Sequence, residues 1–157
     1  MKSKYYLELN QKRRDLAVDN TFDFDNSSYP NCFGTALFLT GEIKVDDHCY
    51  EKLPFILSKL ERIPAPILGC LILFESDKGP YHMGVVVNTN PLLMAHRKGD
   101  MGEFHPKQSL DDALRMYGED FDGNKGRIKF YLPKLLGVES GKWKIIHNLL
   151  ELLEKIV

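Results

Sequence analysis

The apolar pattern of the chain changes at Asn31, after a polar stretch over residues 19–30 that predicts a loop. Beyond it, small and apolar side chains recur at the spacing of one helical face, at Phe33, Ala36, Leu37 and Thr40. Asn31 is a suitable N-cap and Gly41 a suitable C-terminal stop for such a helix. We therefore predict a helix in this segment, with Cys32 in its first turn.

Strand patterns dominate the middle of the chain. Near the N-terminus, Tyr5–Leu9 could be a short strand or a helix. A helix is predicted over residues 54–61, just before the strand segments. Residues 67–75 form a short, nearly continuous apolar run, which is typical of a buried strand. Two turns follow and separate the strands expected at 81–88 and 92–96. Two tight turns that join three strands predict an antiparallel meander.

One more strand and two more helices are predicted in the remainder. A short helix spans residues 109–117 with Ser109 as its cap, and a strand covers 127–132. An amphipathic helix is expected over residues 143–157. The class is therefore α+β, since 157 residues suit one domain with a sizeable core. We expect this single domain to consist of an N-terminal extension at 1–28, a core at 29–133 that carries the candidate functional residues, and a C-terminal helix at 142–157.

Composition and charge restrict the class of partner. A formal net charge of −1 gives no reason to expect nucleic acid or an anionic membrane as a partner. No segment has the roughly eighteen consecutive apolar residues that span a bilayer. The N-terminal positive charges are not followed by an apolar region. As written, the chain is therefore expected to be cytoplasmic, or to be exported by a signal-independent route.

The cysteines and histidines do not follow the spacing of a metal site. The three cysteines are an odd number without CxxC spacing, which argues against a disulfide scaffold and a structural zinc site. His48 and Cys49 could add ligands to His82 and His96, but neither HExxH nor paired CxxC supports this. We expect neither a metal nor another cofactor, and at least one free thiol.

A cysteine in the first turn of a helix has a perturbed chemistry. The partial positive charge there stabilises the thiolate over the thiol and lowers the thiol pKa. The backbone N–H groups of the same turn can donate hydrogen bonds to a developing oxyanion. Gly34 would leave room beside the sulfur of Cys32 for a substrate backbone. Cys32 is thus a candidate nucleophile, although a free cysteine is often only a buried core residue.

Two histidines are candidate partners of this thiol. Alternation along the strand places His82 and Gly84 on the face opposite Met83, where a helix lying across the sheet could meet the histidine. His96 closes the next strand, and the hairpin makes His82 and His96 nearly cross-strand neighbours. A polar residue there can accept the ring N–H and fix its tautomer. Together with the cysteine, the pair predicts a nucleophile, a base and an orienting residue.

Four segments, at residues 31–36, 67–74, 82–87 and 94–96, resemble in order and spacing the motifs of the NlpC-type cysteine peptidases. In that family an Asp-Cys-Ser-Gly helix start precedes a Pro-Gly-Asp-Leu strand, a His-Val-Gly-Ile strand and an Ile-His-Ala strand end. The resemblance implies a papain-like fold, with a catalytic helix packed on an antiparallel sheet. It also implies the site roles of Cys32 as nucleophile, His82 as base and His96 as orienting residue.

The chain departs from the family pattern at several positions. Asn31 replaces the aspartate before the cysteine, Phe33 replaces the serine, and Cys70 replaces the aspartate of the second strand. The family usually has a tyrosine near the oxyanion hole, a role for which Tyr29 is the candidate here, with Gly34 beside the nucleophile. These departures affect the identity of the substrate more than the chemistry.

We therefore expect a cysteine hydrolase that cleaves an amide or peptide bond. The resemblance implies peptide stems of bacterial cell wall as the substrate class, so the expected partner is a peptide or a peptidoglycan fragment. Alternatives are an amidase, deamidase, thioesterase or acyltransferase that acts on another substrate, and a non-catalytic papain-like binding domain. The sequence does not indicate an inhibitor or immunity protein.

Overall fold

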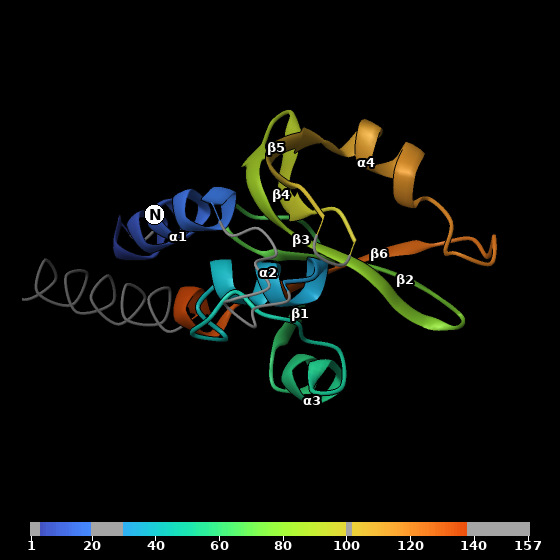
Figure 1. The fold of residues 1–157 in the computed structure, drawn as a ribbon, viewed down its shortest axis with the longest axis horizontal. Helices are drawn as coiled ribbons and strands as arrows, with labels where there is room; N and C mark the ends of the chain where they lie inside the picture. Colours follow the sequence, from blue (N-terminus) through green and yellow to red (C-terminus); the bar gives the residue numbers. More distant parts are fainter. Residues whose placement is uncertain (1–3, 20–29, 100–101, 138–157) are drawn as a thin grey trace, which may run out of the picture.

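Figure 1 shows the computed structural model, which describes residues 4–19, 30–99 and 102–137. The helices and strands of these residues, in chain order, are α1 (Lys4–Asp19), α2 (Cys32–Leu39), α3 (Leu53–Ser58), β1 (Glu61–Ile63), β2 (Leu71–Ser76), β3 (Gly79–Thr89), β4 (Leu92–Arg97), β5 (Phe104–Ser109), α4 (Leu110–Tyr117) and β6 (Arg127–Leu132). They combine helices with an antiparallel sheet, and the predicted α+β class is confirmed. The helix expected at 143–157 lies outside the described residues.

The described strands form one six-stranded sheet in the order β1-β6-β2-β3-β4-β5. Every neighbouring pair is antiparallel, and the predicted meander is confirmed in β2, β3 and β4. The strand predicted at 127–132 is β6, which enters the sheet between β1 and β2. In the part of the chain that the structure describes, no helix combines the length and apolarity needed to cross a bilayer.

Helix α2 begins and ends where the sequence predicts. Asn31 is its N-cap, with extended backbone and a side chain that accepts a hydrogen bond from the Gly34 N–H. Thr40 is the C-cap, and Gly41 follows it with φ +83°, a left-handed conformation in which glycine is unstrained. Every residue of α2 is buried, so the helix lies inside the fold rather than on its surface.

Helix α1 supports the C-terminal end of α2, where backbone carbonyl groups have no partner within the helix. The Asn10 amide donates to the Leu39 carbonyl at 3.1 Å, and the Arg13 guanidinium donates to the Phe38 carbonyl at 2.5 Å. The undecided segment Tyr5–Leu9 is therefore part of a helix of 16 residues. The N-terminal region expected as an extension thus contains a helix that holds α2 in place.

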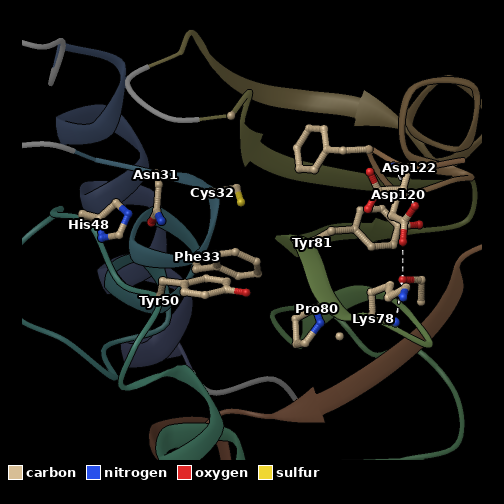
Figure 2. Close-up of a pocket in the computed structure, with 14 residues that line it drawn as sticks. Asn31, Cys32, Phe33, His48, Tyr50, Lys78, Pro80, Tyr81, Asp120 and Asp122 are labelled. Carbon is tan, nitrogen blue, oxygen red and sulfur yellow. Dashed lines mark hydrogen bonds between the residues drawn. The ribbon is translucent and has the colours of Figure 1, made fainter. Parts of the chain in front are cut away.

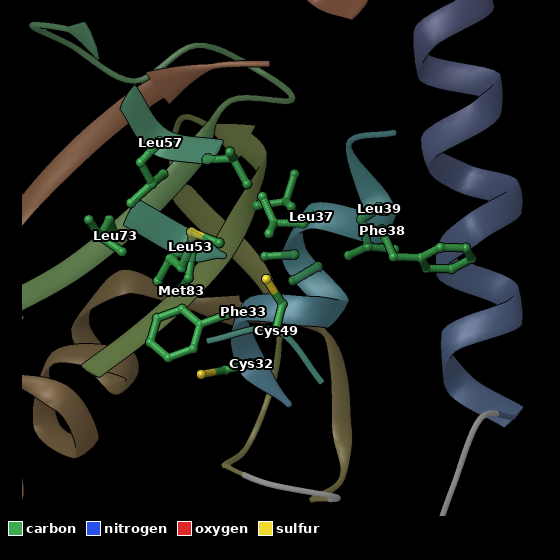
Figure 3. Close-up of a cluster of buried hydrophobic side chains, with 14 of the residues drawn as sticks. Cys32, Phe33, Leu37, Phe38, Leu39, Cys49, Leu53, Leu57, Leu73 and Met83 are labelled. Atoms are coloured by element: carbon green, nitrogen blue, oxygen red, sulfur yellow. The ribbon is translucent and has the colours of Figure 1, made fainter. Parts of the chain in front are cut away.

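Side chains alternate across the sheet and form two apolar clusters, one on each face. On the first face, α2 packs on residues of the central strands, which are Leu71, Leu73, Met83, Val85 and Ala95 (Figure 3). On the second face, Phe74, Val86 and Met94 cluster with Ala113 of α4. The sheet therefore separates α2 from α4.

Two predicted elements had wrong boundaries and one strand was not predicted, for identifiable reasons. The strand expected from residue 67 begins only at Leu71, because the chain bends at Gly69, which has φ +86°. A side chain at Gly69 would overlap the ring of Tyr6, whose hydroxyl donates to the Gly69 carbonyl at 2.6 Å. The helix expected over 54–61 is the shorter α3, and its last predicted residue belongs to β1. Strand β5 was not predicted, because its polar sequence contains a proline, which an edge strand tolerates.

Candidate active site

The start of α2 is tied to the following loop by one side chain. Asn31 Oδ1 accepts from the backbone N–H of Gly34 at 2.7 Å and of Cys49 at 3.2 Å. Asn31 Nδ2 donates to the Cys49 carbonyl at 3.1 Å. These three bonds involve both polar atoms of the amide, so they fix the position of Cys32, the first residue of α2.

The space in front of Gly34 is occupied by the protein itself. A Cβ atom placed at Gly34 would lie 1.6 Å from the backbone carbonyl oxygen of Asp47. The glycine is therefore required for the close approach of this loop to α2. It does not leave room for a substrate backbone, which corrects the reason given for Gly34 from the sequence. Its N–H also donates to Asn31.

A pocket of about 480 Å³ opens beside Cys32. Four aromatic residues line it, and they are Phe33, Tyr50, Tyr81 and Phe121. Lys78, Asp122 and the exposed His48 add polar groups to its wall. In Figure 2 the sulfur of Cys32 points toward the side of the pocket where Tyr81 lies. The pocket thus extends from the start of α2, past the turn between β2 and β3, to the loop that follows α4.

The loop after α4 is held by the carboxylate of Asp120. This group accepts hydrogen bonds from the Ser76 hydroxyl and from the Asn124 side chain and backbone. It also accepts from the backbone N–H of Asp122 at 3.0 Å. Asp120 therefore has a bracing role, and it holds the 93%-exposed ring of Phe121 at the pocket. Among the described residues, no group of three or more acidic, histidine or cysteine side chains could hold a metal ion.

His82 and His96 are brought together as the hairpin predicts. His82 Nε2 lies 3.0 Å from His96 Nδ1, and the two rings meet edge to face. The pairs Val85↔Ala95 and Val86↔Met94 define a register that places Gly84 opposite His96. A Cβ at Gly84 would lie 2.4 Å from the Met94 methyl carbon, 2.8 Å from the Ala95 carbonyl oxygen and 3.1 Å from the His96 Cβ, so the close approach of β4 at this point requires a glycine. Both histidines are buried.

The rings of Phe74 and His105 lie beside this pair, with centroids 5.7 Å from His82 and 5.3 Å from His96. Two more neighbours are Tyr117 and Gln108, and the sequence did not reveal either of these contacts. The ring of Tyr117, at the end of α4, stacks on His82 with a centroid distance of 3.6 Å and an interplanar angle of 4°. Gln108, on β5, hydrogen-bonds through its Oε1 atom to His96 Nε2. In the sequence Tyr117 only marks the end of a short predicted helix, and Gln108 lies in a segment that lacks the alternation typical of a strand. Only the sheet order brings Gln108 beside His96.

The helix that meets His82 is α4 rather than α2. Met83 belongs to the cluster with α2, and His82 lies on the opposite face with Tyr117. At the start of β3, Phe74 pairs with His82 and Glu75 with Pro80, so Tyr81 is an extra, bulged residue. The Tyr81 hydroxyl donates to the Tyr117 carbonyl, so this pocket residue also contacts the α4 side of the sheet.

Tyr117 stacks on His82, and its pKa is raised by burial and in part by a charge on Cys32. Burial raises the pKa of Tyr117 to about 12, and a negative charge at Cys32 adds to this rise. The ring of the same tyrosine stacks on His82, which lies on the face of the sheet opposite α2.

Both histidines are uncharged at neutral pH. Burial lowers the pKa of His82 well below its usual range, and repulsion from His96 lowers it further. Burial is also the main cause that lowers the pKa of His96 to about 4, against the hydrogen bond with Gln108, which raises it. A neutral imidazole can accept a proton, so each ring keeps one unprotonated nitrogen.

Acid is expected to destabilise the fold through these two histidines. Their pKa values are lowered in the folded state, so the unfolded chain binds more protons below pH 6.5. The contribution of the neutral histidines to the free energy of unfolding is fully present above pH 6.5 and is lost as the pH falls from there toward about 4. We expect the free energy of unfolding to drop by up to about 1.4 kcal/mol per pH unit for each histidine. Urea unfolding between pH 7.5 and 4.5 measures this slope.

The control for this slope is a histidine outside the pair. His48 is exposed, so the variant His48→Gln is expected to keep the slope of the wild-type protein. The variant His96→Gln is expected to reduce it, because one of the two buried imidazoles is gone. Equal slopes in all three proteins would contradict the assignment.

The comparisons with known proteins add no relative. No family model, no curated protein and no solved structure gives a significant match to the chain. Tyr29, the candidate for the oxyanion hole, lies outside the described residues. The site therefore depends on Cys32, His82 and His96 with the new neighbours Tyr117 and Gln108.

Proposed function

We propose that this protein is a cysteine hydrolase of the papain-like type, with Cys32 as nucleophile, His82 as base and His96 as the residue that orients the base. The observation that carries the proposal is the pair of buried histidines joined at 3.0 Å, with the ring of Tyr117 stacked on His82. Cys32 itself opens a capped helix in the wall of a pocket.

The proposed reaction assigns one step to each of these residues. Cys32 Sγ attacks the carbonyl carbon of the substrate while His82 accepts the thiol proton. The bond to the leaving amine breaks as His82 returns that proton to the nitrogen, and water then releases the acyl group from the sulfur. His96 accepts a hydrogen bond from the other ring N–H of His82, which keeps the base nitrogen of His82 unprotonated. Tyr117 stacks on the ring and fixes its plane.

The other two cysteines make a contrast that supports this choice. Burial raises the pKa of Cys70 to about 11 and also raises that of Cys49. All three cysteines are buried, so the contrast lies in their positions, because neither Cys49 nor Cys70 starts a helix. Among the three thiols, Cys32 alone combines a helix N-terminus with a position in the wall of the pocket beside α2.

The pocket supports a peptide as the substrate. Its aromatic residues offer apolar surface to side chains, and Lys78 and Asp122 offer charges of both signs. A short peptide with free charged groups would match this combination. Within that class, the resemblance to NlpC-type enzymes favours the peptide stems of peptidoglycan, and we propose them as the first substrate to test.

The reactivity of the thiols tests the proposal without knowledge of the substrate. With iodoacetamide at pH 7, we expect Cys32 to be alkylated at least about tenfold faster than Cys49 or Cys70, because a thiolate is the attacking species. Peptide mass spectrometry measures the three rates in one sample. The variant His82→Gln should slow the reaction at Cys32 only. If Cys32 reacts no faster than an ordinary free thiol, the proposed function fails.

A further inference from the structure

Gln108 contacts the histidine pair from the edge of the sheet. It lies on β5, directly opposite Met94 of β4. The register of the two strands then shifts, so that His105 rather than Gln108 pairs with His96. Its Oε1 atom is bonded to His96 Nε2, and its amide nitrogen lies 3.6 Å from the sulfur of Met116. A thioether sulfur can only accept a hydrogen bond. The amide NH₂ group therefore faces Met116, which leaves the amide oxygen to face the histidine.

The orientation of this amide determines where the ring protons lie. An amide oxygen can only accept, so His96 Nε2 carries the proton that it donates to Gln108. In a neutral imidazole the other nitrogen is then unprotonated, so His96 Nδ1 accepts. Its partner at 3.0 Å, His82 Nε2, must be the donor. Because His82 is also neutral, its Nδ1 atom is left unprotonated.

We infer that Gln108 is a positioning residue that sets the tautomers of both histidines and makes Nδ1 of His82 the base nitrogen. This inference rests on the proposed function for the identity of the base, whereas the tautomers follow from the hydrogen bonds and the neutral state of both rings. Gln108 acts through His96 and does not touch the thiol. Its role resembles that of the third member of a triad, moved one residue further along the chain of hydrogen bonds.

The test reads the tautomers directly by long-range ¹H–¹⁵N NMR of the histidine rings in the full-length protein near pH 7.5. In the wild-type protein we expect protonated Nε2 and unprotonated Nδ1 in both His82 and His96. In Gln108→Leu the acceptor is lost, and we expect mixed tautomers at both rings. Gln108→Glu keeps an acceptor oxygen and should restore the wild-type pattern. The control Gln11→Leu removes a glutamine from the exposed surface of α1 and should change neither ring.

The alkylation rate of Cys32 gives a second readout. We expect it to fall at least about tenfold in Gln108→Leu and to recover in Gln108→Glu, since the other tautomer of His82 has its unprotonated nitrogen at Nε2, beside His96, and its proton at Nδ1. Unchanged tautomers in Gln108→Leu would overturn the inference. If instead the tautomers shift as expected while Cys32 is unreactive in the wild-type protein, the inference about Gln108 stands and the proposed function fails.

Discussion

Replacing Cys32 with alanine is expected to lower the rate of substrate hydrolysis by at least about 10³-fold, because the variant has no atom to form the acyl intermediate. The fold should survive, since alanine suits the first turn of α2 and Asn31 still caps the helix. The release of new amino groups from purified peptidoglycan, compared between the wild-type protein and Cys32→Ala, measures the effect. The matched control is Cys70→Ala, which removes a buried thiol from the other apolar cluster and should retain activity.

The same pair of proteins separates the competing reactions. Wild-type protein is assayed in parallel on a glutamine-containing protein for ammonia release and on a thioester for thiol release. Activity that depends on Cys32 in one of these assays alone would assign a deamidase or a thioesterase. Equal activity of wild type and Cys32→Ala on a substrate would contradict a nucleophilic role, and a wild-type protein inactive on all substrates would favour the papain-like binding domain.

The second large effect is expected at Arg97, whose buried guanidinium links four parts of the fold. It donates to the Thr35 hydroxyl of α2 at 2.8 Å and to the Asp46 carboxylate at 3.0 Å. It also donates to the backbone carbonyls of Ala17 in α1 and of Gly102 before β5. Asp46 in turn accepts from the Thr35 hydroxyl at 2.6 Å. This network positions α2 against the sheet one residue away from His96.

The variant Arg97→Met is expected to lower the free energy of unfolding by about 3–5 kcal/mol, because it leaves the buried Asp46 without its arginine. Urea unfolding at pH 7.5 measures the loss. The control Arg115→Met breaks an exposed pair with Asp112 and should change stability by no more than about 1 kcal/mol. A loss at Arg97 as small as in the control would show that the network does not stabilise the fold.

The sequence was sufficient where the signal is local. Asn31 and Gly41 predict both ends of α2, and the turns between 76 and 91 predict the hairpin that joins His82 to His96. Local signals failed at β5, whose residues become a strand only because β4 offers an open edge. The contact of Gln108 with His96 follows from that pairing and could not be read from the chain.

The sequence by itself determined the α+β class, the position of Cys32 at a helix N-terminus and the approach of the two histidines, because each depends on residues close along the chain. Only the tertiary structure decided which helix meets His82. Alternation gave two faces, and α2 packs on the face of Met83 while α4 places Tyr117 on that of His82. The faces could be told apart only when α2 and α4 were both packed on the sheet. That packing also placed Asp47 in front of Gly34, where the sequence alone had suggested a substrate.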